Sequence, residues 1–217
     1  MPADFSVLIP AGGSGTRFGG DKLQVDLNGR TVLRRSIERF LGRPDVVEVI
    51  VAVPADQLDA LQREHADVTV IVGGGCRAAS VRRALQASAE TDFIAVHDAA
   101  RPAASPKLID RVFAAARNHG ASVPGLPVTD TIKRIDSDVV TETLPRPSLV
   151  AVQTPQAMRR DWLVRAFAEC PISLEQVTDD VQLLELIGLP VQVVDGEPGN
   201  LKLTRPEDLP RLQSALD

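Results

Sequence analysis

The sequence predicts an α/β fold: a Rossmann-like, mostly parallel sheet flanked by helices, with a protruding β-hairpin arm. Over the first 125 residues, short apolar segments alternate with helical patterns, which is typical of parallel strands joined by right-handed crossovers. From residue 127 to 154 the helical period disappears and β-branched residues become frequent, which predicts an antiparallel hairpin. A chain of 217 residues suits a single domain, 1–217, that includes this arm.

The expected strands are short, apolar or β-branched, and bounded by turn residues. They cover Asp4–Ile9, Val46–Val53, Val68–Val72, Phe93–His97, a strand starting at Ala121–Pro124, Val191–Val194 and Leu201–Leu203. The expected helices place their apolar residues on one face, as Leu58 and Leu61 do. They cover Thr31–Leu41, Ala55–His65, Arg77–Ala89, Pro106–Arg117, Arg160–Glu169, Asp179–Ile187 and a closing helix from Pro206.

The hairpin arm has its turn near Asp136-Ser137-Asp138. A hairpin that leaves a compact domain is poorly stable alone, so it needs a surface to pack on. A second copy of the chain would supply one, and we expect a homodimer formed through residues 127–154. The alternative is a hairpin folded back onto its own domain.

Composition narrows the classes of partner. The formal net charge of −5 argues against a nucleic-acid partner, and no apolar run approaches the ~20 residues of a membrane helix. The start of the chain lacks the basic and long apolar segments of a secretory signal, and the two cysteines do not make a disulfide framework. We therefore expect a reduced, cytoplasmic protein that binds neither nucleic acid nor membrane.

The most informative segment is the glycine-rich stretch LIPAGGSGTRFGGDK, residues 8–22, which follows a buried strand. Glycines let backbone N–H groups approach an anion, and Arg17 and Lys22 add positive charge. This favours a polyphosphate ligand, although the segment matches neither the Walker loop nor the dinucleotide fingerprint. A structural turn without a ligand is the alternative.

Other polar segments follow strands or lie on the arm. Asp98 and Arg101, after the Phe93–His97 strand, suit a metal, a sugar hydroxyl or a phosphate, whereas His97 is expected to be structural. The segment 129–134 suits a phosphate or a solvated edge strand. Arg146, Thr154 and the segments 178–180 and 200–208 are uninformative alone. The sequence contains no C-x-x-C, H-E-x-x-H or G-x-S-x-G pattern, so thiol, metal-hydrolase and serine-esterase chemistry have no support.

Taken together, these segments resemble a known family. The glycine-rich stretch is similar to the signature loop of sugar-phosphate nucleotidyltransferases. With VHDAARP, PVTDTIKR, TPQ and NLKLTRPEDL in order, residues 5 to 212 resemble the 2-C-methyl-D-erythritol 4-phosphate cytidylyltransferases of the non-mevalonate isoprenoid pathway. The resemblance implies that the substrate phosphate attacks the α-phosphorus of CTP and releases pyrophosphate, with Mg²⁺ carried by the triphosphate and no protein metal ligands.

The resemblance also assigns residues to roles. Arg17 and Lys22 would be catalytic and stabilise the transition state. The nucleotide would be bound by Ala11, Gly12, Gly13, Gly15, Gly74, Arg77, Ser80 and Asp98. The sugar-alcohol phosphate would be bound by Arg101, Thr131, Lys133, Arg146, Thr154, Thr178 and Lys202. In the family the arm exchanges between subunits, so its residues would serve the neighbouring site.

The sequence departs from the family pattern at Asp21, where proline is common, and at Cys76 and Ala79, where the family is more polar. Competing interpretations are a ribitol 5-phosphate cytidylyltransferase, another nucleotidyltransferase such as a guanylyltransferase, and a catalytically idle nucleotide-binding regulatory protein. The pairing of Arg17 with Lys22 argues against the idle protein, because a binding protein does not need the second cation.

Overall fold

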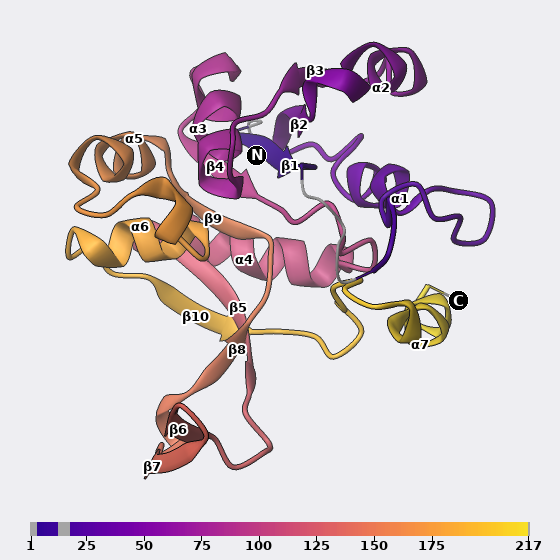
Figure 1. The fold of residues 1–217 in the computed structure, drawn as a ribbon. Helices are drawn as coiled ribbons and strands as arrows, with labels where there is room; N and C mark the ends of the chain where they lie inside the picture. Colours follow the sequence, from indigo (N-terminus) through magenta and orange to yellow (C-terminus); the bar gives the residue numbers. More distant parts are fainter. Residues whose placement is uncertain (1–3, 13–17, 217) are drawn as a thin grey trace.

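The computed structural model describes residues 4–12 and 18–216. Within them, one eight-stranded sheet has the order β10-β5-β9-β4-β1-β2-β3, with β8 paired to β5 (Figure 1). The strands are β1 (Phe5–Pro10), β2 (Val46–Val53), β3 (Thr69–Val72), β4 (Phe93–Val96), β5 (Ala121–Pro127), β6 (Lys133–Asp136), β7 (Val139–Thr143), β8 (Val150–Val152), β9 (Gln156–Arg159) and β10 (Gln192–Asp195). The α-helices are α1 (Val32–Glu38), α2 (Leu58–Glu64), α3 (Arg77–Ala87), α4 (Pro106–His119), α5 (Arg160–Glu169), α6 (Asp180–Leu186) and α7 (Leu209–Ser214).

The sheet is mostly parallel, as the sequence predicts. β1 pairs in parallel with β2 and β4, β2 with β3, and β10 with β5. β9 runs antiparallel between β4 and β5, so it joins the two parallel parts into one sheet. The carboxyl ends of β1, β2, β3 and β4 therefore meet at one edge, where ligands of such sheets bind.

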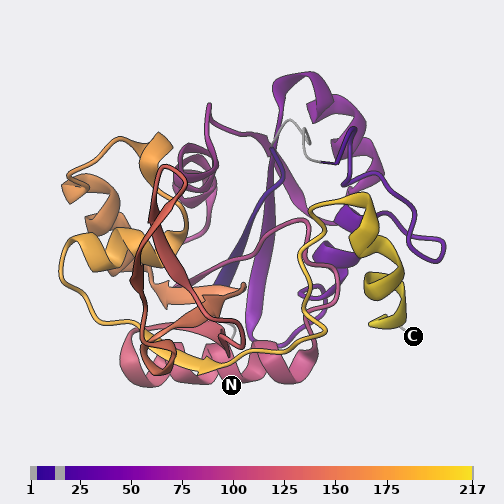
Figure 2. The same ribbon diagram turned by 60° about the horizontal axis from the view of Figure 1, so that its bottom comes forward.

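Helices cover both faces of this sheet, because alternate residues of each buried strand point to opposite faces. Phe5, Val7 and Ile9 of β1 pack toward α1, α2 and α4, whereas Leu8 packs toward α3, α5 and α6. Figure 2 shows α4 lying across one face. Both layers are needed, since a strand apolar on both sides cannot face water.

A third apolar cluster joins the C-terminal helix to the segment after the glycine-rich loop. Leu203 and Leu212 are fully buried against Leu27 and Val32. This cluster corrects the expected strand at Leu201–Leu203. Among residues 4–12 and 18–216 the segment has no strand partner, and the Leu203 N–H donates to Ala100 O (2.8 Å), in the loop after β4. Its leucines pack on loops and on α7 instead.

The arm is a separate two-stranded sheet, β6–β7, that projects from the body (Figure 1). Ser137 takes a positive φ of 53° at its tip, where the sequence predicts the turn. The chain returns through β8, which pairs antiparallel with the end of β5.

Candidate active site

Two cavities lie at the carboxyl edge of the parallel strands, and Arg77 lines both. The first, here the glycine pocket, has a volume of about 340 Å³ and is lined by Gly12, Val53, Pro54, Ala55, Val72, Gly73, Gly74, Gly75, Cys76, Arg77 and Ser80. The second, here the carboxylate pocket, has a volume of about 150 Å³ and is lined by Arg77, Asp98, Arg101, Val152, Gln153, Thr154, Gln156, Thr178, Asp179 and Lys202. Residues from seven separate segments thus converge on one edge of the sheet.

A larger cavity of about 750 Å³ lies at the opposite end of β4, beside the start of α5. Its basic groups are already occupied: Arg159 pairs with Asp161, and Arg160 donates to Ser88 Oγ and to backbone carbonyl oxygens at the end of α3. We place the site at the two smaller pockets, because the polar groups there converge on open space.

The glycine pocket depends on a close contact between a loop and α3. A Cβ atom at Gly74 would lie 2.5 Å from Cβ of Ala79, so only glycine fits. Ser80 Oγ accepts a hydrogen bond from Gly74 N–H (3.0 Å) and donates one to Cys76 O (3.0 Å). The Ser80 hydroxyl therefore holds the loop Gly73–Gly75, which lines the pocket together with side chains such as Cys76 and Arg77.

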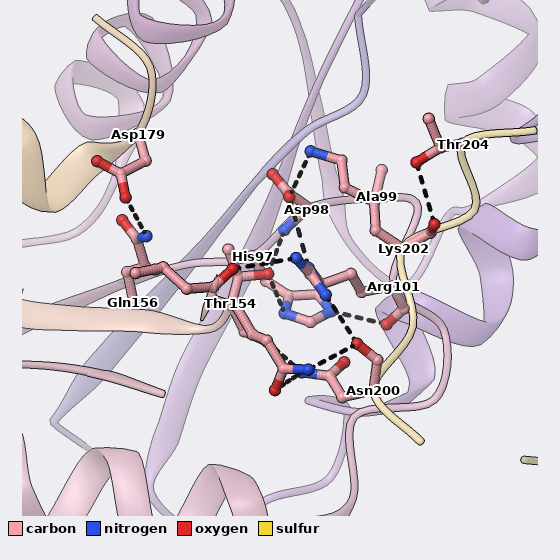
Figure 3. A network of polar contacts seen from close by, with 12 residues as sticks. His97, Asp98, Ala99, Arg101, Thr154, Gln156, Asp179, Asn200, Lys202 and Thr204 are labelled. Carbon is pink, nitrogen blue, oxygen red and sulfur yellow. Dashed lines mark hydrogen bonds and ion pairs between the residues drawn. The ribbon is translucent and has the colours of Figure 1, made fainter. Parts of the chain in front are cut away.

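In the carboxylate pocket, Asp98 is the centre of charge (Figure 3). Its carboxylate lies 2.8 Å from Lys202 Nζ, 3.1 Å from Arg77 and 3.7 Å from Arg101 Nε. Burial acts to raise the pKa of Asp98, but the three cations outweigh it and hold the pKa well below its usual range. The pocket therefore presents an ionised carboxylate surrounded by more positive than negative charge.

Behind this carboxylate, His97 is fully buried. Its Nδ1 lies 3.2 Å from Thr154 Oγ1 and its Nε2 lies 3.0 Å from Arg101 O (Figure 3). Burial lowers the pKa of His97 to about 4, so the ring is neutral at physiological pH. Asp98 N–H donates to Thr154 Oγ1 (3.0 Å), so His97 and Thr154 together fix the turn that carries Asp98 and Arg101.

Further polar residues, to which the sequence analysis gave no role in the site, support this turn. Arg101 Nη1 donates to Asn200 O (2.7 Å), and Asn200 Nδ2 donates to Thr154 O (2.8 Å). Gln153 Nε2 donates to Glu197 O (2.9 Å). These residues are far apart in the chain, and the only local signal was the polar character of the segments that contain them.

The sequence-predicted residues divide into three groups: those that line the two pockets, those in or beside the glycine-rich loop after β1, and those on the arm. Gly12, Gly74, Arg77, Ser80, Asp98, Arg101, Thr154, Thr178 and Lys202 line the two pockets. Ala11, at the end of β1, is buried and donates its N–H to Ala52 O (2.8 Å). Lys22 is half-buried, and the Asp21 carboxylate accepts the Leu23 N–H (3.1 Å). Gly13, Gly15 and Arg17 lie outside the described residues.

The third group lies on the arm, and the pocket linings in the described chain do not include it. Thr131 is exposed, Lys133 Nζ donates to Thr143 Oγ1 (2.6 Å), and Arg146 Nη1 donates to Thr129 O (2.7 Å). Within one chain, therefore, these arm side chains line neither the glycine pocket nor the carboxylate pocket.

Over residues 4–12 and 18–216, no cluster of three or more His, Cys, Asp or Glu side chains is arranged to hold a metal ion. In the same part of the chain, no helix combines the length and apolarity needed to cross a bilayer.

Comparison with known proteins gives consistent matches. A family model described as 2-C-methyl-D-erythritol 4-phosphate cytidylyltransferase matches residues 5–217. A relative of that name from Symbiobacterium thermophilum is 46% identical over 94% of this chain and 89% of its own length. The crystal structure of the enzyme from Thermus thermophilus superposes with a TM-score of 0.80, at 36% identity, over 98% of both chains.

Some relatives are longer. A bifunctional enzyme IspD/IspF from Anaeromyxobacter sp. is 40% identical over 98% of this chain, which spans 57% of the relative's length.

Proposed function

Because the chain belongs to the 2-C-methyl-D-erythritol 4-phosphate cytidylyltransferase family, we propose that it transfers a cytidylyl group from CTP to 2-C-methyl-D-erythritol 4-phosphate and releases pyrophosphate. The observation that carries this proposal is the carboxylate pocket, where Arg77, Arg101 and Lys202 converge on Asp98 beside a backbone-lined pocket. Such a site is suited to two anionic ligands that must meet.

CTP occupies the glycine pocket in this proposal. The loop Gly73–Gly75 would offer backbone groups to the base edge, and Gly12, which also lines this pocket, would face the phosphates. The family resemblance assigns Ala11, Gly13 and Gly15 to the phosphates as well. Arg77 lines both pockets, and Asp98 contacts Arg77. The ionised Asp98 carboxylate would therefore accept a hydrogen bond from a ribose hydroxyl of a nucleotide that reaches this point. In this arrangement the nucleotide would be held by backbone groups, by Arg77 and by Asp98, and its phosphates would also meet Arg17 and Lys22.

The sugar-alcohol phosphate occupies the carboxylate pocket. Lys202 is the pocket's exposed cation, with 39% of its side chain accessible, and Thr154 and Thr178 add hydroxyl groups. Arg101 is held against Asn200 and supplies a second, more buried charge. Thr131, Lys133 and Arg146 would complete this pocket from the arm of a second subunit.

The chemistry needs positioning more than proton transfer. A phosphate nucleophile is already ionised, so no general base is required, and the neutral, buried His97 acts only through Thr154 and Arg101. Arg17 and Lys22 would stabilise the charge that develops around the α-phosphorus. Aligning two anions against their mutual repulsion is then the main contribution of the protein.

Mg²⁺ fits this site as a companion of the triphosphate. The ion prefers hard oxygen ligands, and phosphate oxygens supply them. Asp98 and Asp179 are the carboxylates among the described pocket-lining residues, and Asp98 is already engaged by Arg77 and Lys202. When bound, the ion neutralises phosphate charge, and the residues of this chain hold the phosphates around it.

The proposal includes a homodimer in the cytoplasm. The arm exposes large apolar side chains: Ile135, Val139 and Val140 are 61%, 67% and 56% accessible. An apolar hairpin that projects into solvent gains stability by pairing with a second copy. Sedimentation equilibrium at micromolar concentration should give a dimer, and a monomer would contradict this part. The two free cysteines suit a reducing compartment.

One assay tests the activity. The purified protein with Mg²⁺ is offered each nucleoside triphosphate against 2-C-methyl-D-erythritol 4-phosphate and against ribitol 5-phosphate, and pyrophosphate release is measured. We expect release only with CTP and the methylerythritol phosphate. Release with ribitol 5-phosphate alone would favour the second cytidylyltransferase, and nucleotide binding without any release would favour a regulatory protein.

A further inference from the structure

Asp180, the first residue of α6, is a charged side chain that the proposed mechanism does not use. Its side chain has no solvent exposure, and its Oδ2 lies 2.7 Å from Arg77 Nη2. Among the described residues its Oδ1 has no hydrogen-bond partner. An ionised carboxylate is costly to bury, and a buried ion pair rarely adds net stability over an apolar pair of the same shape. The contact with Arg77 therefore calls for a reason other than stability.

The position of Asp180 is fixed by its neighbours. Gln156 Oε1 accepts the N–H groups of Asp180 and Val181, both at 3.0 Å, and Gln156 Nε2 donates to Asp179 Oδ2 (2.9 Å). Figure 3 shows the contact between Gln156 and Asp179. A buried amide on β9 thus ties the start of α6 to the sheet, and Asp180 has little freedom to follow a moving partner.

Arg77 is the residue that needs such a fixed partner. It begins α3, lines both pockets, and has Asp98 as its second carboxylate, at 3.1 Å. Asp98 itself lines the carboxylate pocket and also contacts Lys202 and Arg101. A phosphate that enters this pocket competes with Asp98 for all three cations. Asp180 lies behind Arg77, outside the pocket lining, so its hold on the guanidinium does not compete with the ligand.

We propose that Asp180 is a positioning residue for cytidylyl transfer: it keeps the Arg77 guanidinium in the wall between the nucleotide and the sugar phosphate while both ligands bind. The inference rests on the proposed function. Burial raises the pKa of Asp180 and the charge of Arg77 opposes this rise, which agrees with a carboxylate whose ionised form depends on that one arginine.

The first experiment compares Asp180→Asn with the wild type and with Glu185→Gln, an exposed carboxyl on the same helix. Asparagine keeps the shape of the side chain and removes its charge, so among the described residues Asp98 is then the one carboxylate that pairs with Arg77. We expect kcat to fall about 10- to 100-fold, as for small misplacements of a group that orients reactants, while KM for CTP changes less than about threefold. Glu185→Gln should match the wild type.

The second experiment is a double-mutant cycle with Arg77→Ala. Removing the arginine leaves Asp180 buried without a counter-charge, so Tm should fall, and adding Asp180→Asn should raise Tm again. The same addition should leave kcat at the Arg77→Ala value, because Asp180 acts on the reaction only through Arg77. A structural role alone would restore Tm and kcat together.

The outcomes separate the two proposals. If the wild type releases no pyrophosphate from CTP and 2-C-methyl-D-erythritol 4-phosphate, both proposals fail. If the wild type is active but folded Asp180→Asn keeps the wild-type kcat, only the positioning role of Asp180 is overturned. The same holds if the fold-decrease in kcat of the double variant equals the product of the fold-decreases of the two single variants, because the two residues would then act independently.

Discussion

The carboxylate pocket and the β6–β7 arm both carry charged side chains, but they hold them in opposite ways. In the pocket, Asp98 has only 10% of its side chain exposed and is surrounded by three cations. On the arm, Arg134 and Glu142 pair at 2.9 Å with 63% and 51% of their side chains exposed. The ion pairs around Asp98 are formed within one chain, whereas the arm carries exposed groups that we expect to act only against another surface.

The largest effect that would sharpen this contrast is expected at Lys22, on the body side. Lys22→Ala should lower kcat about 10²- to 10³-fold and raise KM for CTP much less, because the cation acts on charge that develops in the transition state. Steady-state kinetics would measure both, with Lys107→Ala on the exposed face of α4 as the control. Equal losses in kcat and in CTP binding would mean that Lys22 only holds the ground-state nucleotide.

The next effect concerns the buried histidine of the pocket. The folded-state pKa of His97, about 4, is below the unfolded value of about 6.5. Between these values the unfolded chain binds more protons, so the free energy of unfolding should fall as pH drops from about 6.5 to about 4, by about 3 kcal/mol from this residue.

Denaturant unfolding at several pH values would test this. His97→Gln, compared with the wild type, should flatten the pH dependence over that window. Some slope should remain in His97→Gln, because burial also lowers the pKa of His65. An unchanged slope in His97→Gln would show that the ring is accessible to protons in the folded state.

On the arm, Arg146→Ala should raise KM for the sugar phosphate about 10- to 100-fold and leave KM for CTP nearly unchanged, by loss of a charge-assisted contact to the phosphate. Mixing this variant with Lys22→Ala by co-refolding would show whose site the arm serves. If it serves the neighbour, each mixed dimer has one intact site, and activity should recover to roughly a quarter of the wild-type value. No recovery would place Arg146 in the pocket of its own chain.

The smallest effect compares an ion pair on the arm with a less exposed one in the body, between the start of β1 and the end of α4. Arg134→Gln on the arm should change the free energy of unfolding by less than about 0.5 kcal/mol, because both partners are solvated. Arg117 donates to both oxygens of Asp4, at 2.7 and 2.8 Å, and these side chains are only 20% and 15% exposed. Arg117→Gln should therefore cost about 1–2 kcal/mol. If chemical denaturation shows that both variants lose the same free energy of unfolding, the exposed arm pair and the less exposed body pair do not differ in strength.

Much of the fold follows from local patterns. Helix α5 has the predicted bounds, because Leu163 and Ala166 mark one apolar face between clear ends. Strand β9 could not be predicted, since QAMR is short and carries polar residues at both ends, and Gln156 is buried only because α6 supplies partners for its amide. The expected strand at 201–203 is wrong because its alternating leucines serve loop packing rather than a sheet.

The site was predictable only where motifs lie on consecutive residues. Asp98 and Arg101 stand out at a strand end, whereas Asp180 and Asn200 owe their roles to contacts across about 100 residues of sequence, with Arg77 and Arg101. No pattern of spacing encodes such contacts. The arm residues Thr131, Lys133 and Arg146 stay predictions that depend on a second chain.

The return path from the arm sets a rule for how this chain tolerates insertions and deletions. Strand β8 ends at Val152, Gln153 N–H bonds Pro124 O (2.8 Å), and Thr154 already contacts His97. Since neighbouring strand residues face opposite ways, one residue gained or lost between 149 and 153 would turn the Thr154 hydroxyl away from the Asp98 turn. Extra residues at Ser137, by contrast, would lengthen the tip and leave the register of β8 intact.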